Sequence, residues 1–187
     1  MDTDRRSFIK TMCLTGMCAC GAGSLVSAQT ATDGDAPAEP PVGMPHKWIA
    51  ALLPLLAEGD RAAAQRLLKG CAASHYEDLK MQATVERFKG RLEAFLEFLG
   101  KEWGWIIDYD PAQGVILVNE NKSACVCPLI HKGYGRDLGI LCHCSEGFAE
   151  KMFSEVTGVK VCAQVTESVL RGHKSCKYRI DLKPAQA

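Results

Sequence analysis

The chain has 187 residues, and its 22 lysines and arginines balance its 22 aspartates and glutamates, so the formal net charge is zero. Without an excess of positive charge, neither nucleic acid nor a membrane surface is expected as a partner. The sequence also holds ten cysteines, and the chemistry expected of them depends on the compartment in which the protein works.

The first 28 residues have the parts of an export signal with a twin-arginine core. Residues 4–10 (DRRSFIK) precede an uncharged apolar stretch over residues 11–26, and Val26-Ser27-Ala28 supplies the small residues of a cleavage site. The stretch is too short and too rich in glycine for a stable membrane span. We therefore expect transport by the twin-arginine export machinery, cleavage after Ala28, and a periplasmic or extracellular mature protein without a membrane span.

Two alternatives remain open for residues 1–28. In the first, the arginines are only the positive flank of an ordinary secretory signal. In the second, the protein is a lipoprotein modified at Cys18 or Cys20. This is less favoured because neither cysteine has a leucine three residues before it.

Residues 29–45 have the composition of a disordered tether. Residues 46–187 are then expected to form a single cysteine-rich α+β domain.

The first half of this domain is expected to be helical. Two short helices are predicted over His46–Ala57 and Asp60–Leu68. Ser74–Glu77 (SHYE) has the form of a capping box and predicts the start of a long helix that ends at Gly100 or Gly104. The long helix has one apolar stripe, made by Val85, Phe88, Leu92, Phe95, Leu96 and Leu99.

The second half changes to the period of strands. Trp105–Gly114 predicts a strand and an Asp-Pro turn closed by glycine. Val115–Val118 begins a second strand, which we expect to run on through the cysteines and to stop at Pro128.

One helix is expected within the strand region. Ser145 is predicted to cap a helix over Glu146–Val156. Strands follow around Val161–Val165, where apolar residues alternate, and over Cys176–Leu182. The fold class is therefore predicted to be α+β, with N-terminal helices packed on an antiparallel-rich sheet that has one inserted helix.

Seven cysteines remain after removal of the signal: Cys71, Cys125, Cys127, Cys142, Cys144, Cys162 and Cys176. An odd number does not favour a purely disulfide-bonded domain. Four of the seven form two Cys-X-Cys pairs, Cys125/Cys127 and Cys142/Cys144, and residues i and i+2 of a strand share a face. Two facing pairs would place four sulfurs around one zinc ion or iron–sulfur cluster, with Cys71 as a further ligand. Two inter-strand disulfides are the alternative.

The second pair also suggests catalysis. Cys142 and Cys144 stand just before the helix that Ser145 is expected to cap, where the helix dipole favours a thiolate. A thiolate nucleophile or a metal-bound water could act here, with Glu146 or His143 to move protons, and Cys142, Cys144 and Glu146 are the candidate catalytic residues.

The other cysteines and several histidines have weaker assignments. Cys162 and Cys176 fall among apolar neighbours in strands and are expected to be small core residues. His75, His131 and His143 are near the cysteines in sequence and are further candidates to complete a coordination shell.

The segment Cys142–Leu182 resembles the C-terminal part of the 4-vinyl reductase-like domains and of the related L-2-amino-thiazoline-4-carboxylic acid hydrolase-like family. The residues that carry the resemblance are Thr157-Gly158, Ser168, Gly172 and Cys176. The resemblance implies a ligand-binding fold in which the cysteines lie near a pocket and bind metal. Its members include small-molecule sensors, proteins linked to tetrapyrrole reduction, and ring-opening hydrolases.

The expected function is that of an exported domain that binds zinc or an iron–sulfur cluster through its Cys-X-Cys motifs and has a small-molecule pocket or a redox role. The twin-arginine route exports folded proteins, so it suits a protein that acquires its cofactor inside the cell. The alternative is a hydrolase of the L-2-amino-thiazoline-4-carboxylate type. The expected partners are a small molecule or a redox protein, and a second copy of the chain as a homodimer.

Overall fold

The computed structural model describes residues 43–127, 129–130 and 138–183, which all belong to one compact unit, Pro40–Ala187. The expected export signal, the cysteines at 18 and 20, most of the tether, Pro128 and His131 lie outside the described residues. The described part is α+β, as predicted, with helices packed on a four-stranded antiparallel sheet.

Five α-helices are described: α2 (Met44–Glu58), α3 (Arg61–Asp78), α4 (Met81–Glu86), α5 (Leu92–Trp103) and α6 (Cys142–Thr157). Asp60 starts α3, because its carboxylate accepts hydrogen bonds from the amides of Ala62 at 2.8 Å and Ala63 at 3.1 Å. Two short 3₁₀ segments are η1 (Leu138–Leu141) and η2 (Val169–Arg171). None of the described helices combines the length and apolar character that a membrane crossing requires.

The strands are β1 (Ile106–Asp110), β2 (Val115–Asn119), β3 (Cys162–Glu167) and β4 (Lys177–Asp181), in the order β1-β2-β4-β3. All neighbours are antiparallel, and Ile116 pairs with Ile180 at the centre. The hairpin turn closes where Asp110 accepts the amides of Ala112 and Gln113 and Gly114 adopts φ 69°. The Asp-Pro turn of the sequence is therefore confirmed.

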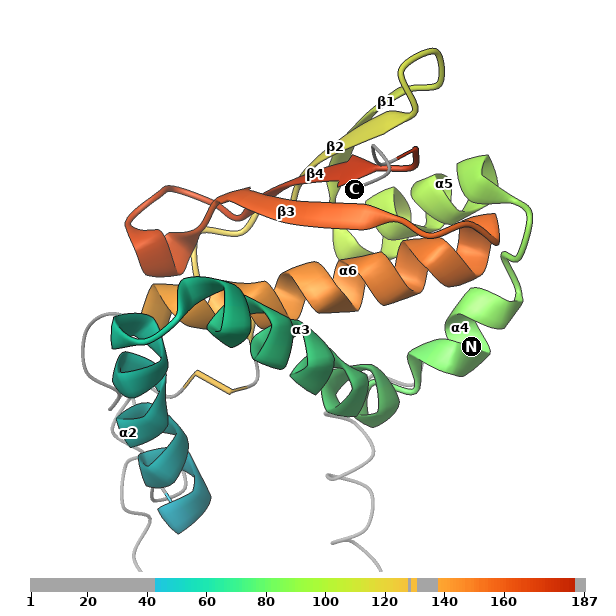
Figure 1. The fold of residues 1–187 in the computed structure, drawn as a ribbon. Coiled ribbons are helices and arrows are strands. Elements are labelled where there is room, and N and C mark those ends of the chain that lie inside the picture. The colour runs from blue at the N-terminus through green and yellow to red at the C-terminus, as the bar shows by residue number, and fades with distance from the viewer. Residues whose placement is uncertain (1–42, 128, 131–137, 184–187) are drawn as a thin grey trace, which may run out of the picture. The chain divides into compact units, whose positions relative to one another are not determined.

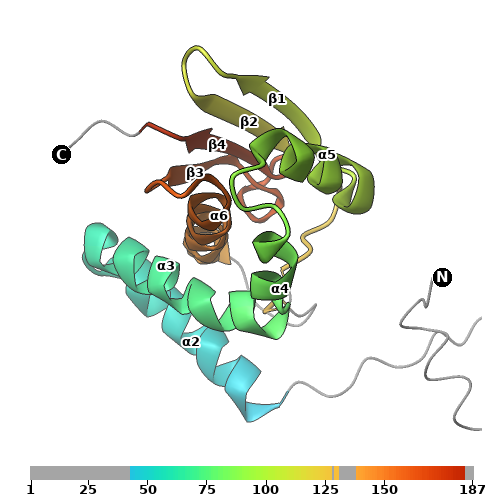
Figure 2. The same cartoon turned by 90° about the vertical axis from the view of Figure 1, so that its right-hand side faces the viewer.

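Helix α6 lies between the sheet and α3, as both ribbon views show (Figures 1 and 2). The core between these layers contains side chains with no exposed surface: Phe95, Ile116, Met152, Phe153, Val156 and Ile180. Helices α3 and α6 approach closely at Gly147, where an added Cβ would lie 2.7 Å from the Cα of Lys69. The cross-layer contact is thus made by backbone as well as by side chains.

The helical half differs from the prediction at Ser74. Helix α3 continues through Ser74–Glu77 to Asp78, so this segment is not a helix start. Continuation of α3 buries the ring of Tyr76 to 1% exposure, and its hydroxyl donates to Glu155 at 2.8 Å. This burial outweighs a local capping preference. The single long helix is instead two helices, α4 and α5, which separate near Gly90 at φ 69°.

The structure also changes the setting of both Cys-X-Cys pairs. Strand β2 ends at Asn119, so Cys125 and Cys127 lie in an irregular segment rather than on a strand. Helix α6 begins at Cys142, so Ser145 is inside the helix and the predicted cap is wrong. The end of α6 at Gly158, with φ 72°, agrees with the Thr-Gly stop in the sequence.

Candidate functional site

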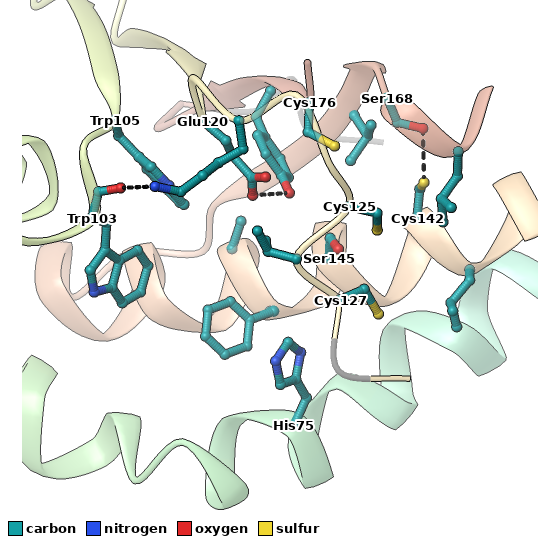
Figure 3. Close-up of a pocket in the computed structure, with 18 of the residues that line it drawn as sticks. His75, Trp103, Trp105, Glu120, Cys125, Cys127, Cys142, Ser145, Ser168 and Cys176 are labelled. Carbon is teal, nitrogen blue, oxygen red and sulfur yellow. Dashed lines mark hydrogen bonds between the residues drawn. The ribbon is translucent and has the colours of Figure 1, made fainter. Parts of the chain in front are cut away.

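A cavity of about 340 Å³ opens between α3, α5, α6 and the ends of β2 and β4. Its volume is within the range of small-molecule pockets. The wall is mainly apolar and aromatic, and its rings belong to Trp103, Trp105, Phe148, Tyr178 and His75. Figure 3 shows four cysteines of the chain, Cys125, Cys127, Cys142 and Cys176, around the same space.

Glu120 and Tyr178 form a buried polar pair in this wall. Their exposed fractions are 7% and 6%, and the Tyr178 hydroxyl donates to Oε1 of Glu120 at 2.8 Å (Figure 3). The amide of Glu120 donates to the carbonyl of Cys176 at 3.0 Å, which fixes its backbone beside β4. Burial raises the pKa of Glu120, while the hydrogen bond from Tyr178 acts against this rise. The pair is a buried polar group in a wall that is mainly apolar.

Cys142 is the pocket thiol with the most defined partner. Its Sγ donates to Oγ of Ser168 at 3.2 Å, and Ser168 has no exposed surface (Figure 3). The same Oγ accepts the amide of Arg171 at 3.2 Å. Burial raises the pKa of Cys142, and the Ser168 hydroxyl and the Arg171 charge oppose that rise. Ser168 and Arg171 thus partly compensate for the cost of a buried thiolate.

The cysteines of the two Cys-X-Cys pairs differ in their orientation toward the cavity, and burial raises their pKa values. Burial raises the pKa of Cys127 to about 11, and burial with the nearby Cys71 raises that of Cys144 to about 11. The expectation that the start of the helix favours thiolates at Cys142 and Cys144 is therefore wrong, because burial dominates at both. Residues i and i+2 of a helix point roughly 200° apart, so Cys142 faces the cavity and Cys144 does not line it.

The remaining cysteines divide between the cavity and the surface. Cys176 is buried and lines the cavity, so its expected burial is confirmed, and its pKa is raised by burial to about 11. Cys162 is exposed rather than in the core, because Val161, Ala163 and Val165 occupy the inward positions around it. Cys71 on α3 is also exposed, and the seven cysteines of the described residues are free thiols.

No group of three or more histidine, cysteine, aspartate or glutamate side chains in the described part of the chain is arranged to hold a metal ion. Cys125, Cys127 and Cys142 do share the cavity, whereas Cys144 and Cys71 are outside its wall. Three of the five predicted ligands are therefore brought to one place. His75 also lines the cavity, where burial lowers its pKa and its ring contacts that of Phe148 in a tilted arrangement, with the centroids 4.7 Å apart.

Glu146 is buried at 1% exposure but does not line the cavity. Its carboxylate accepts the amide of Val165 at 3.1 Å, Nε2 of Gln65 at 3.0 Å and Nδ1 of His143 at 2.9 Å. Burial raises the pKa of Glu146, but the hydrogen bonds outweigh burial and hold the pKa below its usual value. The carboxylate therefore joins α6 to β3 and α3, away from the cavity in which a nucleophile would act.

Several lining residues were missed in the sequence: Glu120, Trp103, Trp105, Tyr178 and the partner role of Ser168. Trp103 and Trp105 are two positions apart at the end of α5, but no local spacing connects them with Glu120, Ser168 or Tyr178. The available signal was a glutamate two residues beyond the apolar run Val115–Val118, because a charge beside a buried segment needs a partner.

No protein-family model matches the chain, and no curated protein matches it. Among solved structures the chain is similar to a trafficking protein particle complex subunit 3 from Naegleria fowleri, covalently bound to palmitic acid. The two are 13% identical with a TM-score of 0.51, and the match covers 75% of this chain and 92% of that chain. At this identity the similarity shows the α+β fold alone.

Proposed function

We propose that the protein binds a small, mostly apolar molecule in the cavity beside Cys142, as members of the 4-vinyl reductase-like ligand-binding fold do. The observation that carries the proposal is the cavity of about 340 Å³ with its aromatic wall and the Glu120–Tyr178 pair inside it. Apolar walls supply affinity and a few fixed polar groups orient the ligand. The palmitic acid of the distant structural neighbour supports inclusion of an acyl chain among the ligands tested.

The direct test is binding of the neutral dye Nile red to the full chain, with decanol and decanoic acid as competitors. Ala149 lines the cavity and is 2% exposed, so Ala149→Leu should occupy ligand space and abolish displaceable binding. Ala64 is equally buried but outside the cavity, so Ala64→Leu is the matched control and should retain binding while it destabilises the fold by roughly 1–3 kcal/mol. Equal binding by both variants would exclude this cavity as the site.

A metal centre is the second candidate, with zinc or an iron–sulfur cluster held by Cys125, Cys127 and Cys142. The supporting observation is that these three thiols line one cavity. Cys144 and Cys71, the other predicted ligands, do not line the cavity, but Cys144 is near enough to Cys127 to help raise its pKa. Metal analysis and visible absorbance of protein purified without oxygen test this candidate, with Cys125→Ser expected to lose the metal and the exposed Cys162→Ser expected to keep it.

The hydrolase alternative rests on Cys142 as its nucleophile. Cys142 lines the cavity and has Ser168 beside its sulfur, whereas Cys144 and Glu146 are outside the wall. A turnover assay with L-2-amino-thiazoline-4-carboxylate should then lose activity in Cys142→Ser and retain it in Cys144→Ser. Activity that survives Cys142→Ser would remove this alternative.

Twin-arginine export to the periplasm or extracellular space also remains a proposal, supported by residues 4–10 of the sequence. Replacement of both Arg5 and Arg6 by lysine should leave the protein in the cytoplasm, and a signal of the ordinary secretory type should tolerate the change.

A further inference from the structure

Helix α2 presents an apolar face that no described part of the chain covers. Met44, Trp48 and Leu55 are 73%, 61% and 66% exposed, and Ala51 between them is exposed as well. The opposite side of α2 packs on α3 and η1, and Leu53 there is 2% exposed. Large apolar side chains gathered on one exposed face mark an interaction site.

The spacing of this face fits a helix partner. Met44, Trp48, Ala51 and Leu55 follow one another at intervals of four, three and four residues, which is the pattern of a helix pair seam. Helix α2 lies at the edge of the described part of the chain, beside α3 (Figure 2). Its charged residues are Lys47 near the start and Glu58 at the end. A helix that lies on anionic membranes is instead rich in lysine and arginine on its polar face.

We propose that α2 pairs with α2 of a second copy of this chain in antiparallel orientation about a two-fold axis between Ala51 and Leu52. In this arrangement Trp48 of each copy packs on Leu55 of the other, and the small Ala51 lets the helices approach. Lys47 of one copy then lies about two helix positions, roughly 3 Å of rise, from Glu58 of the other, so each end of the seam has a charge pair. A two-fold interface needs such self-complementarity, because the same surface serves both partners.

The charges make the test specific. On one helix Lys47 and Glu58 are separated by eleven positions, about 16 Å of helix rise, so they do not pair within a chain. The Lys47→Glu variant and the Glu58→Lys variant should each weaken the dimer of the full chain at least about threefold, because each places like charges together. The double variant should restore the wild-type dissociation constant, since the pair is then only reversed.

Sedimentation velocity over a range of protein concentrations measures the association. Trp48→Glu should make the protein monomeric, and Ile106→Glu, at a 58% exposed apolar position on β1, is the matched control that should dimerise as wild type does. A monomeric wild-type chain, or a dimer unaffected by Trp48→Glu, would overturn the proposal. Loss of rescue in the charge-reversed double variant would overturn the antiparallel arrangement, and binding of the face by residues 1–42 of the same chain would appear as a monomer throughout.

Discussion

The thiol of Cys142 donates a hydrogen bond to Oγ of Ser168 across 3.2 Å and so joins the first residue of α6 to the residue that caps η2. This contact is buried, and it holds the sulfur at the wall of the cavity rather than toward the neighbouring helix. Any chemistry of Cys142 therefore depends on Ser168 as well as on the sulfur.

Replacement of Ser168 by alanine should slow alkylation of Cys142. Burial raises the pKa of Cys142, and the Ser168 hydroxyl opposes that rise because it can turn to donate to the ionised sulfur, so its loss should raise the pKa further. At a fixed, mildly alkaline pH the iodoacetamide rate at Cys142, followed by peptide mass spectrometry, should fall by roughly three- to tenfold. Cys162 is exposed and serves as the internal control, with an unchanged rate. An unaltered Cys142 rate would mean that Ser168 does not tune the thiol.

The exposed and the most buried of the seven thiols should react at different rates. Cys71 and Cys162 are exposed and should react first with a disulfide reagent under native conditions. Cys144 and Cys176 are buried with pKa values raised to about 11, so they should react slowest until the protein is denatured. A chain that begins at Gln29 has seven cysteines, and fewer than seven titratable thiols after denaturation without reductant would point to disulfides or to bound metal instead.

Replacement of Gly147 by alanine should destabilise the packing of α6 on α3. The new Cβ would lie 2.7 Å from the Cα and 2.9 Å from the carbonyl carbon of Lys69, and backbone atoms there move only if the helices separate. The free energy of unfolding in urea should fall by roughly 1–3 kcal/mol. Gly70 of α3 has no atom within 4 Å of its added Cβ, so Gly70→Ala should instead stabilise by about 0.5–1 kcal/mol.

The Glu146→Gln variant should lose stability in a pH-dependent way. Because hydrogen bonds hold the folded pKa of Glu146 below the usual value of 4.5, the wild type gains stability that is fully present above pH 4.5 and is lost as the pH falls through the folded pKa. At neutral pH the variant should be less stable by about 2–3 kcal/mol. The gap should narrow in acid, as urea unfolding at a series of pH values would measure.

The exposed Glu93→Gln variant is the control for this comparison, because its carboxylate is on the outer side of α5. Its stability should follow that of wild type at every pH. A gap for Glu146→Gln that is constant from neutral pH into acid would show that the Glu146 carboxylate does not carry the pH dependence.

Local patterns in the sequence predicted the elements better than the site. The Asp-Pro hairpin, the glycine after α6 and the alternating Val161, Ala163 and Val165 were each visible because turn chemistry and strand period act over a few residues. The segment SHYE also has a valid capping pattern, but burial of Tyr76 inside α3 depends on the distant Glu155. Local preference yields where a long-range contact is stronger.

The two Cys-X-Cys pairs show the same limit for the candidate site. Their identical spacing suggested identical geometry, yet one pair is in an irregular segment and the other begins a helix. On the helix the two sulfurs diverge, so spacing alone did not determine which thiols meet. Glu120 was not predicted as a site residue for a related reason, since its hydrogen-bond partner Tyr178 is 58 positions further along the chain.

The cavity wall is assembled from segments that are distant in the sequence, among them His75 of α3, Trp103 of α5, Phe148 of α6 and Tyr178 of β4. A molecule held there would contact both the helical half and the sheet and so link them noncovalently. The described cysteines of the chain form no disulfides that could link them covalently. At a ligand concentration about a hundred times the dissociation constant, such binding adds roughly 2.7 kcal/mol to the free energy of unfolding. The lifetime of the protein would then depend on the supply of its ligand, because proteases would remove the less stable empty form first.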